Sequence, residues 1–165
     1  MEGLESLYRA LGPMLLAYLR RQVGRRGDAE ELLQETFLVA ARQSDSLAAA
    51  GSQRAWLFGV ARNLVREHVR RRTRRNTATL CEEPASPIAE REDERIEAMR
   101  AAFERLPEVQ REALELRLSE DLSYAEIAEA LAIPIGTVRS RLHHAVAALR
   151  VALGAEEGHS ALRAR

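Results

Sequence analysis

The segment that runs from Ser123 to Leu149 limits most strongly what this chain can fold into. Apolar residues recur at helical spacing on both sides of Pro134, and a proline interrupts a helix at the point where it stands. Ser123 and Glu126 form a capping box that favours a helix start, and Thr137 is the expected N-cap of a second helix. Two helices joined by a short turn are therefore predicted, at the spacing of a helix-turn-helix. The expected inward residues are Ile127, Ala128, Leu131, Val138, Leu142, Val146 and Leu149.

Charge is divided unevenly between these two helices. Residues 111–131 contain two Arg and six acidic residues, whereas residues 132–150 contain three Arg, two His and no acid. An acid-free second helix is typical of a recognition helix that enters the major groove of DNA. The alternative, an amphipathic hairpin with a solvated Arg face, is disfavoured because turn, caps, spacing and charge agree. The expected base-reading residues are Arg139, Ser140 and His143, and the expected phosphate-contacting residues are Thr137, Arg141 and His144.

The charge of the whole chain is also segregated, although its formal sum is zero. Residues 1–75 carry 14 Arg and 8 acids, whereas residues 76–110 carry 4 Arg and 9 acids. Residues 54–75 alone carry 8 Arg against one acid. Such a basic stretch in a neutral protein indicates local contact with a polyanion.

Helical periodicity covers the first 72 residues. A helix is expected over residues 4–23, with Pro13 kinking or splitting it, and a second from an N-cap at Asp28 to about residue 42. The small-residue stretch 44–53 is expected to be a loop, and a long helix follows over residues 54–72. The second helix has the apolar stripe Leu32, Leu33, Thr36, Phe37 and Ala40, and the largely polar stripe Glu31, Gln34, Glu35 and Leu38. The long helix is expected to point Trp56, Leu57, Val60, Ala61 and Leu64 inward and to present Gly59, Arg62, Asn63, Arg66 and Arg70 on another face.

Periodicity disappears over residues 76–94, where Thr, Ser, Pro and acidic residues dominate and a flexible acidic linker is expected. Order resumes near Arg95, and Pro107 suits the first turn of the next helix. The expected apolar positions there are Ile96, Met99, Phe103 and Leu106, then Val109, Ala113, Leu114, Leu116 and Leu118. The predicted fold is all-α, with two small helical domains at residues 1–75 and 95–153, the linker between them and a tail at 154–165.

Several classes of protein are disfavoured. The single cysteine, Cys81, excludes an internal disulfide and a cysteine-cluster zinc site, and no cofactor or metal is expected. No apolar run approaches the length of a membrane span and no signal-peptide pattern is present, so a soluble cytoplasmic protein without membrane insertion is expected. No phosphate-binding loop, nucleophile elbow or catalytic carboxylate pair is found, so an enzyme is not expected.

Four stretches carry a resemblance to a known family. SYAEIAEALAIPIGTVRSRLHHAVAALR resembles region 4.2 of the extracytoplasmic-function group of sigma-70 family factors, and AAFERLPEVQREALELRLSEDL resembles region 4.1. DAEELLQETFLVA resembles regions 2.1 and 2.2, and RAWLFGVARNLVREHVRRR resembles regions 2.3 and 2.4. The resemblance covers roughly residues 4–72 and 95–150, in the family's order. It implies a factor that binds core RNA polymerase, directs it to promoter DNA and is held inactive by an anti-sigma factor.

The resemblance also implies roles for individual residues. Glu31, Gln34 and Glu35 match positions that dock on the clamp helices of the polymerase β′ subunit. The stretch 44–53 would cradle an extruded base of the melted strand. Four positions depart from the family pattern. Ala132 stands where glycine is usual in the turn, and Glu31 stands where aspartate is usual in region 2.2. His143 and His144 stand where arginine or an aromatic residue is common. The residues that match the face meeting the −10 element are Arg62, Asn63, Arg66 and Arg70.

Two other functions remain open at this point. A LuxR-type regulator would share the helix-turn-helix but would carry a receiver or ligand-binding domain in its N-terminal half. A pure protein-interaction module would bind polymerase without supporting transcription.

Overall fold

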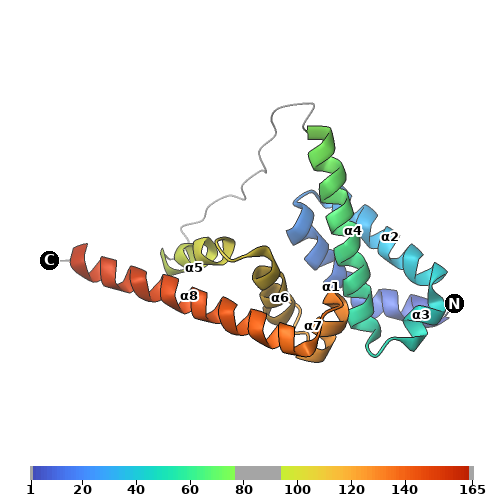
Figure 1. The fold of residues 1–165 in the computed structure, drawn as a ribbon. Helices are drawn as coiled ribbons and strands as arrows, with labels where there is room; N and C mark the ends of the chain where they lie inside the picture. Colours follow the sequence, from blue (N-terminus) through green and yellow to red (C-terminus); the bar gives the residue numbers. More distant parts are fainter. Residues whose placement is uncertain (1, 77–93, 164–165) are drawn as a thin grey trace. The chain divides into compact units, whose positions relative to one another are not determined.

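The computed structural model describes residues 2–76 and 94–163, and all the secondary structure within these two ranges is helical (Figure 1). The chain divides into two compact units: the first holds the helices of residues 2–76 together with residues 125–132, and the second holds the other helices after residue 94. The predicted all-α class with two helical units is confirmed. Cys81 and all but the ends of the expected linker lie outside the described residues.

The first unit is built from α1 (Glu2–Val23), α2 (Arg26–Arg42), α3 (Ser44–Ala49) and α4 (Gln53–Asn76). In Figure 1, α4 crosses α1 and α2, and these three helices contact one another pairwise. Two edge-to-face aromatic pairs join them: Tyr18 with Phe58, whose ring centroids lie 5.4 Å apart, and Tyr8 with Phe37, at 4.9 Å. The buried side chains of this unit include Leu15, Tyr18, Leu19, Phe37, Leu57 and Phe58.

The boundaries of these helices differ from the prediction in three places. Helix α1 continues through Pro13 and is not split. Helix α2 begins at Arg26 after an N-cap at Arg25, so Asp28 lies in its first turn instead of capping it. An acid in the first turn also interacts favourably with the helix dipole, so the sequence pattern places the N-cap three residues too late. The expected loop 44–53 contains α3, and α4 is longer than predicted at both ends.

Helix α4 is rotated relative to the prediction. Phe58 and Val65 are buried, although neither was expected to point inward, whereas Trp56, Val60 and Leu64 are only half-buried. Leu57 and Ala61 are fully buried as predicted. The first half of α4 has apolar residues on most of its circumference, so periodicity alone left the buried face ambiguous.

The second unit is built from α5 (Glu94–Glu104), α6 (Glu108–Leu118) and α8 (Ile135–Arg163). Figure 1 shows α8 as one long helix, and α5 and α6 both pack on it. The short helix α7 (Tyr124–Leu131) precedes α8 in the chain and is joined to it by a three-residue turn. Within the described ranges, no helix is long and apolar enough to cross a membrane.

Alanines occupy interior positions that the prediction assigned to larger residues. Ala102 is buried in α5 and Ala145 in α8, whereas Met99 and Val146 are exposed. Small interior residues let packed helices approach closely, but an alanine gives a weak hydrophobic signal in a sequence pattern. The expected apolar positions that are exposed in this unit are Ile96, Met99, Val109, Leu118 and Val146.

Replacement of Phe58 tests the rotation assigned to α4. Phe58 is 1% exposed, and Phe58→Ala leaves a cavity beside Tyr18, so the free energy of unfolding should fall by about 3–5 kcal/mol. Val69→Ala on the same helix is the matched control. Its side chain is 47% exposed, so the change should stay within about 0.5 kcal/mol. Urea denaturation followed by circular dichroism measures both, and equal effects would show that the assigned face is wrong.

Candidate docking and nucleic-acid-binding surfaces

One side of α2 is polar and lies opposite the buried side. Glu31 and Gln34 are exposed and Glu35 is half-buried, and Leu38 extends the same side with 54% of its surface exposed. Among the residues that the structure describes, the side chains of Glu31, Gln34 and Glu35 form no hydrogen bond or ion pair. These four residues, called the α2 polar face below, are therefore available to an outside partner.

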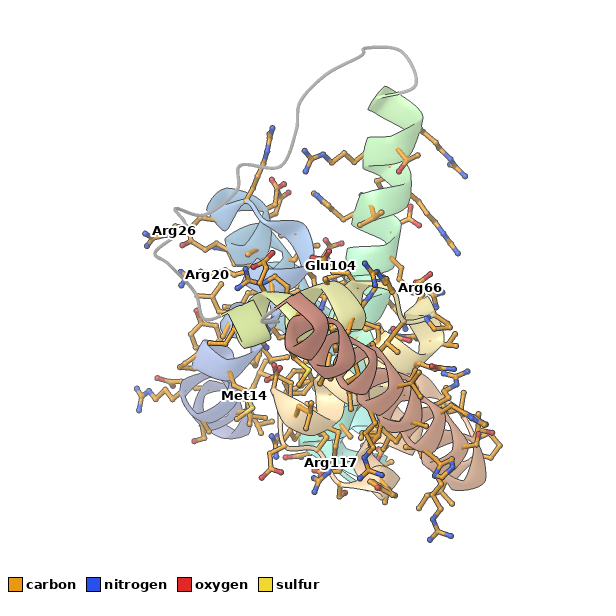
Figure 2. All side chains as sticks on the ribbon, turned by 90° about the vertical axis from the view of Figure 1, so that its left-hand side faces the viewer. Met14, Arg20, Arg26, Arg66, Glu104 and Arg117 are labelled. Carbon is orange, nitrogen blue, oxygen red and sulfur yellow. The ribbon has the colours of Figure 1, made fainter. Side chains whose placement is uncertain are left out.

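The neighbouring acid, Glu30, is engaged within the chain. Arg26 Nε lies 2.9 Å from Glu30 Oε1, and Arg20 Nη2 lies 3.6 Å from the same oxygen. The hydrogen bond from Arg26 lowers the pKa of the Glu30 carboxyl, and attraction to Arg20 acts in the same direction. Figure 2 labels both arginines on the helices that carry them. Adjacent carboxylates on one helix thus differ, because Glu30 is neutralised by neighbours and Glu31 is not.

The opposite side of α2 is apolar except for one hydroxyl. Thr36 is completely buried, and its Oγ1 donates a hydrogen bond to the carbonyl oxygen of Leu32 at 2.7 Å. This bond satisfies the hydroxyl inside the helix, so its burial does not leave an unpaired polar group. The predicted apolar stripe of this helix is confirmed in full by the buried residues Leu32, Leu33, Thr36, Phe37 and Ala40.

A basic surface lies along α4. Asn63, Arg66 and Arg70 are exposed and Arg62 is half-buried, and Figure 2 shows Arg66 on this helix. These four residues are called the α4 basic face below, and the structure places them on one helix as predicted. Its neighbour Arg71 differs from them, because Arg71 Nε pairs with Glu67 Oε1 at 3.0 Å.

Sequence reasoning missed a contact that joins α2 to α4. His68 Nε2 lies 3.3 Å from Asp28 Oδ2, and both side chains are half-buried. The two groups are not aligned for a hydrogen bond, so the contact is an electrostatic one that attracts only while His68 is protonated. It connects the first turn of the helix with the polar face to the helix with the basic face. A pattern confined to single helices does not reveal such a pair.

The turn before α8 contains a strained residue. Ala132 has φ +52, in the left-handed region that favours glycine, and its N–H donates to the carbonyl oxygen of Glu129 at 3.1 Å. This conformation explains why glycine is usual at this position in the family that the sequence resembles. Helix α8 begins at Ile135, and the N–H of Thr137 donates to the carbonyl oxygen of Pro134 at 2.9 Å. Thr137 is therefore the third residue of the helix and not its N-cap, because Pro134 already accepts the first backbone bonds.

The predicted DNA-reading residues all lie in the first three turns of α8. Arg139, Ser140, His143 and His144 are exposed, whereas Thr137 and Arg141 are half-buried. The Ser140 hydroxyl donates to the Thr137 carbonyl oxygen at 3.1 Å, and the rings of His143 and His144 meet edge to face at 5.6 Å. In the described part of the chain, the guanidinium groups of Arg139 and Arg141 form no hydrogen bond or ion pair. This surface of α8 therefore presents uncompensated positive charge.

Two protein-family models match the chain. The family described as Sigma-70 region 2 matches residues 7–75, which contain the α2 polar face and the α4 basic face, and the one described as Sigma-70, region 4 matches residues 96–149. The two matches lie in the same order as the two helical units and together cover most of the described residues.

Curated relatives extend over most of the chain. The RNA polymerase sigma factor HrpL of Pseudomonas syringae pv. syringae is 33% identical over 141 residues, which cover 80% of this chain and 77% of that protein. The extracytoplasmic-function sigma factor EcfG of Rhodopseudomonas palustris is 35% identical over 155 residues, with 88% and 83% covered. The corresponding factor SigL of Mycobacterium tuberculosis is 33% identical over 156 residues, with 91% and 88% covered.

Two solved structures are similar to this fold. The sigma factor RpoE of Bartonella quintana, in complex with the anti-sigma factor NepR, has a TM-score of 0.71 and 26% identity, with 93% of this chain and 98% of that chain covered. The structure of CnrH, in complex with the cytosolic domain of CnrY, has a TM-score of 0.64 and 25% identity, with 93% and 89% covered.

Replacement of Ala132 by glycine should stabilise the protein. The left-handed conformation strains a residue with a Cβ by about 1–2 kcal/mol, and glycine removes this strain. Glycine also loses about 0.4–1 kcal/mol more backbone entropy on folding, so Ala132→Gly should raise the free energy of unfolding by roughly 0.5–1 kcal/mol. Ala130→Gly, inside α7, is the control and should lower it. A decrease for both variants in urea denaturation would contradict the strain at Ala132.

Proposed function

The chain belongs to the sigma-70 family, as an RNA polymerase sigma factor of the extracytoplasmic-function group, and we propose that three of its helix faces divide the contacts with polymerase and promoter DNA. A LuxR-type regulator is not favoured, because the region 2 match occupies residues 7–75. One observation carries the proposal: the faces on α2, α4 and α8 expose charged side chains opposite buried apolar ones, and several of these charges have no partner in the described parts of the chain. In this role the chain catalyses no reaction of its own and acts in the cytoplasm, where polymerase is.

The α2 polar face is proposed to dock on the clamp helices of the polymerase β′ subunit. Glu31 and Glu35 supply unpaired carboxylates, and Gln34 supplies an amide between them that can donate and accept. Leu38 adds an exposed apolar side chain at the end of this face. Charged groups around an apolar contact are the usual composition of a protein interface.

The α4 basic face is proposed to meet the −10 element. Arg62, Asn63, Arg66 and Arg70 follow one side of a helix whose other side is buried in the first unit. Arginines on such a surface attract the phosphate backbone in a salt-dependent way. The stretch 44–53 just before this helix is proposed to receive an extruded base, which requires a shaped pocket because unstacking a base costs a few kcal/mol.

The first turns of α8 are proposed to read the −35 element. Arg139, Ser140 and His143 are the proposed base-reading residues, and Thr137, Arg141 and His144 the proposed phosphate contacts. Arg139 is the strongest candidate for a base contact, because it is exposed and its fork of donors matches guanine in the major groove.

An anti-sigma factor is a further proposed partner. Both structural relatives described above were solved as complexes, RpoE with an anti-sigma factor and CnrH with the cytosolic domain of CnrY. Their fold similarity over most of this chain supports regulation of the same kind. Such a partner would inhibit by covering surfaces that polymerase needs.

Run-off transcription with core polymerase tests the function. The chain should stimulate transcription from a subset of promoters in a genomic library, and absence of stimulation on every promoter would refute it. The double variant Glu31→Ala/Glu35→Ala should bind core polymerase about tenfold or more weakly, a loss of at least about 1.4 kcal/mol, and should transcribe correspondingly less. Glu30→Ala is the matched control: it removes the adjacent carboxylate, which is already engaged by Arg26, and should bind as the unaltered chain does.

Replacement of Arg139 tests the assignment of base reading. Arg139→Ala should weaken binding of the reconstituted holoenzyme to its own promoter by about 1–3 kcal/mol and change binding to random DNA little. Competition binding with the two DNAs measures the difference. An equal loss on both would mean that Arg139 contacts phosphate only. Arg150→Ala, on the same helix beyond the proposed reading turns, should preserve the preference.

A further inference from the structure

We propose that Arg117, at the end of α6, is a positioning residue for promoter recognition, which holds the turn between α6 and α7 in the shape that sets the start of the helix-turn-helix. This inference rests on the proposed role of α8 in reading DNA. Arg117 is not one of the residues assigned to a polymerase or DNA contact above. It acts through the backbone of the turn.

The guanidinium of Arg117 contacts three points along the turn. Its Nη1 donates hydrogen bonds to Asp121 Oδ1 and to the carbonyl oxygen of Leu122, both at 3.1 Å. Its Cζ lies 6.0 Å from the ring centroid of Tyr124, the first residue of α7, within the range of a cation–π contact. One side chain thus joins the last turn of α6 to the first residue of α7. Figure 2 labels Arg117 on the second unit.

The turn needs such support because its backbone is unusual. Asp121 has φ +48, in the left-handed region that L residues rarely adopt. Directly after it, the N–H of Leu122 donates back to the carbonyl oxygen of Leu116 at 3.1 Å, and both leucines are buried. The chain therefore reverses tightly between two anchored side chains. Arg117 reaches across this reversal.

The relative strength of the contacts indicates what Arg117 contributes. Asp121 is 90% exposed, so its ion pair with Arg117 contributes little to stability. The hydrogen bond to the Leu122 carbonyl oxygen is part-buried and satisfies a backbone acceptor in the turn, and the Tyr124 contact brings the guanidinium to the first residue of α7. These two contacts therefore affect the direction of the backbone at the start of α7 more than they affect the charge of the turn. A fork of fixed donors suits this task, and the single ammonium of lysine does not reproduce it.

The direction of the chain at Tyr124 matters for DNA reading because α7 leads through a three-residue turn into α8. Base contacts require donors to lie within hydrogen-bond distance of base edges, so a small change in the entry to the helix-turn-helix misplaces them. Phosphate contacts depend on charge and tolerate such a change better. Loss of Arg117 should therefore reduce discrimination between sequences more than total DNA affinity.

The test compares Arg117→Ala with Arg111→Ala in reconstituted holoenzyme. Arg111 is a matched control, because it lies on the same helix and its Nη1 donates to a backbone carbonyl, that of Glu104, at 3.0 Å, away from the α6–α7 turn. The probes are a promoter with the −35 sequence that the unaltered holoenzyme selects from a randomised pool, and the same promoter with that element scrambled. Arg117→Ala should reduce the preference for the selected sequence about tenfold, and Arg111→Ala should leave it unchanged.

Three readouts separate positioning from other roles. If Arg117 contacts a phosphate directly, Arg117→Ala will lower the slope of log affinity against log salt concentration by about 0.9 and weaken binding to both probes equally, which would overturn the proposal. If Arg117 is a positioning residue, the slope stays unchanged. Arg117→Lys should recover little of the preference, whereas full recovery would indicate a simple charge. Circular dichroism must show that Arg117→Ala is folded at the assay temperature. If the folded variant keeps its preference for the selected −35 sequence, Arg117 has only a stabilising role, and the proposal is refuted. If the unaltered holoenzyme shows no −35 preference, the proposed function of α8 fails instead.

Discussion

Burial of one apolar face on each helix is the constraint on which the exposed chemistry of this chain depends. A buried Leu or Phe contributes about 1.5–3 kcal/mol, whereas an exposed ion pair contributes at most about 1 kcal/mol, so the apolar side chains decide how each helix is rotated. Once Leu57 and Phe58 are inside, helical geometry places Asn63 and Arg66 outside. The basic face of α4 is therefore a consequence of its core contacts. The same reasoning applies to α2, whose polar residues lie opposite its buried stripe.

Two polar contacts between separate elements refine this arrangement. His68 and Asp28 connect α4 to the start of α2, and Arg117 connects α6 to the start of α7. In both cases a side chain on one helix contacts the first turn of another. The first turn is where the direction of a helix is set, so a weak interaction there can change the position of the far end of the helix. Both contacts lie outside the faces that are proposed to meet polymerase and DNA.

Sequence reasoning was most accurate where polar and apolar residues separate cleanly. Every residue of the predicted apolar stripe of α2 is buried, and its polar stripe is exposed or half-buried. It was least accurate in α4, where Trp56, Val60 and Phe58 compete for the interior, and in α8, where Ala145 is buried in place of Val146. The helix starts were displaced because Asp28 and Thr137 have the chemistry of caps but lie inside the first turns. The contact between His68 and Asp28 depends on how two helices pack, and no local pattern contains that information.

The free side chains of the α2 polar face have a consequence for how this chain can change over evolutionary time. Because the side chains of Glu31, Gln34 and Glu35 form no hydrogen bond or ion pair in the described chain, replacing them should change the folding energy little. Substitutions at these positions are therefore limited mainly by the partner proposed for them, whereas substitutions at Thr36 or Phe37 are limited by the fold itself. The outer side of this helix is thus free to change with its proposed polymerase partner, while the inner side can change only together with the core.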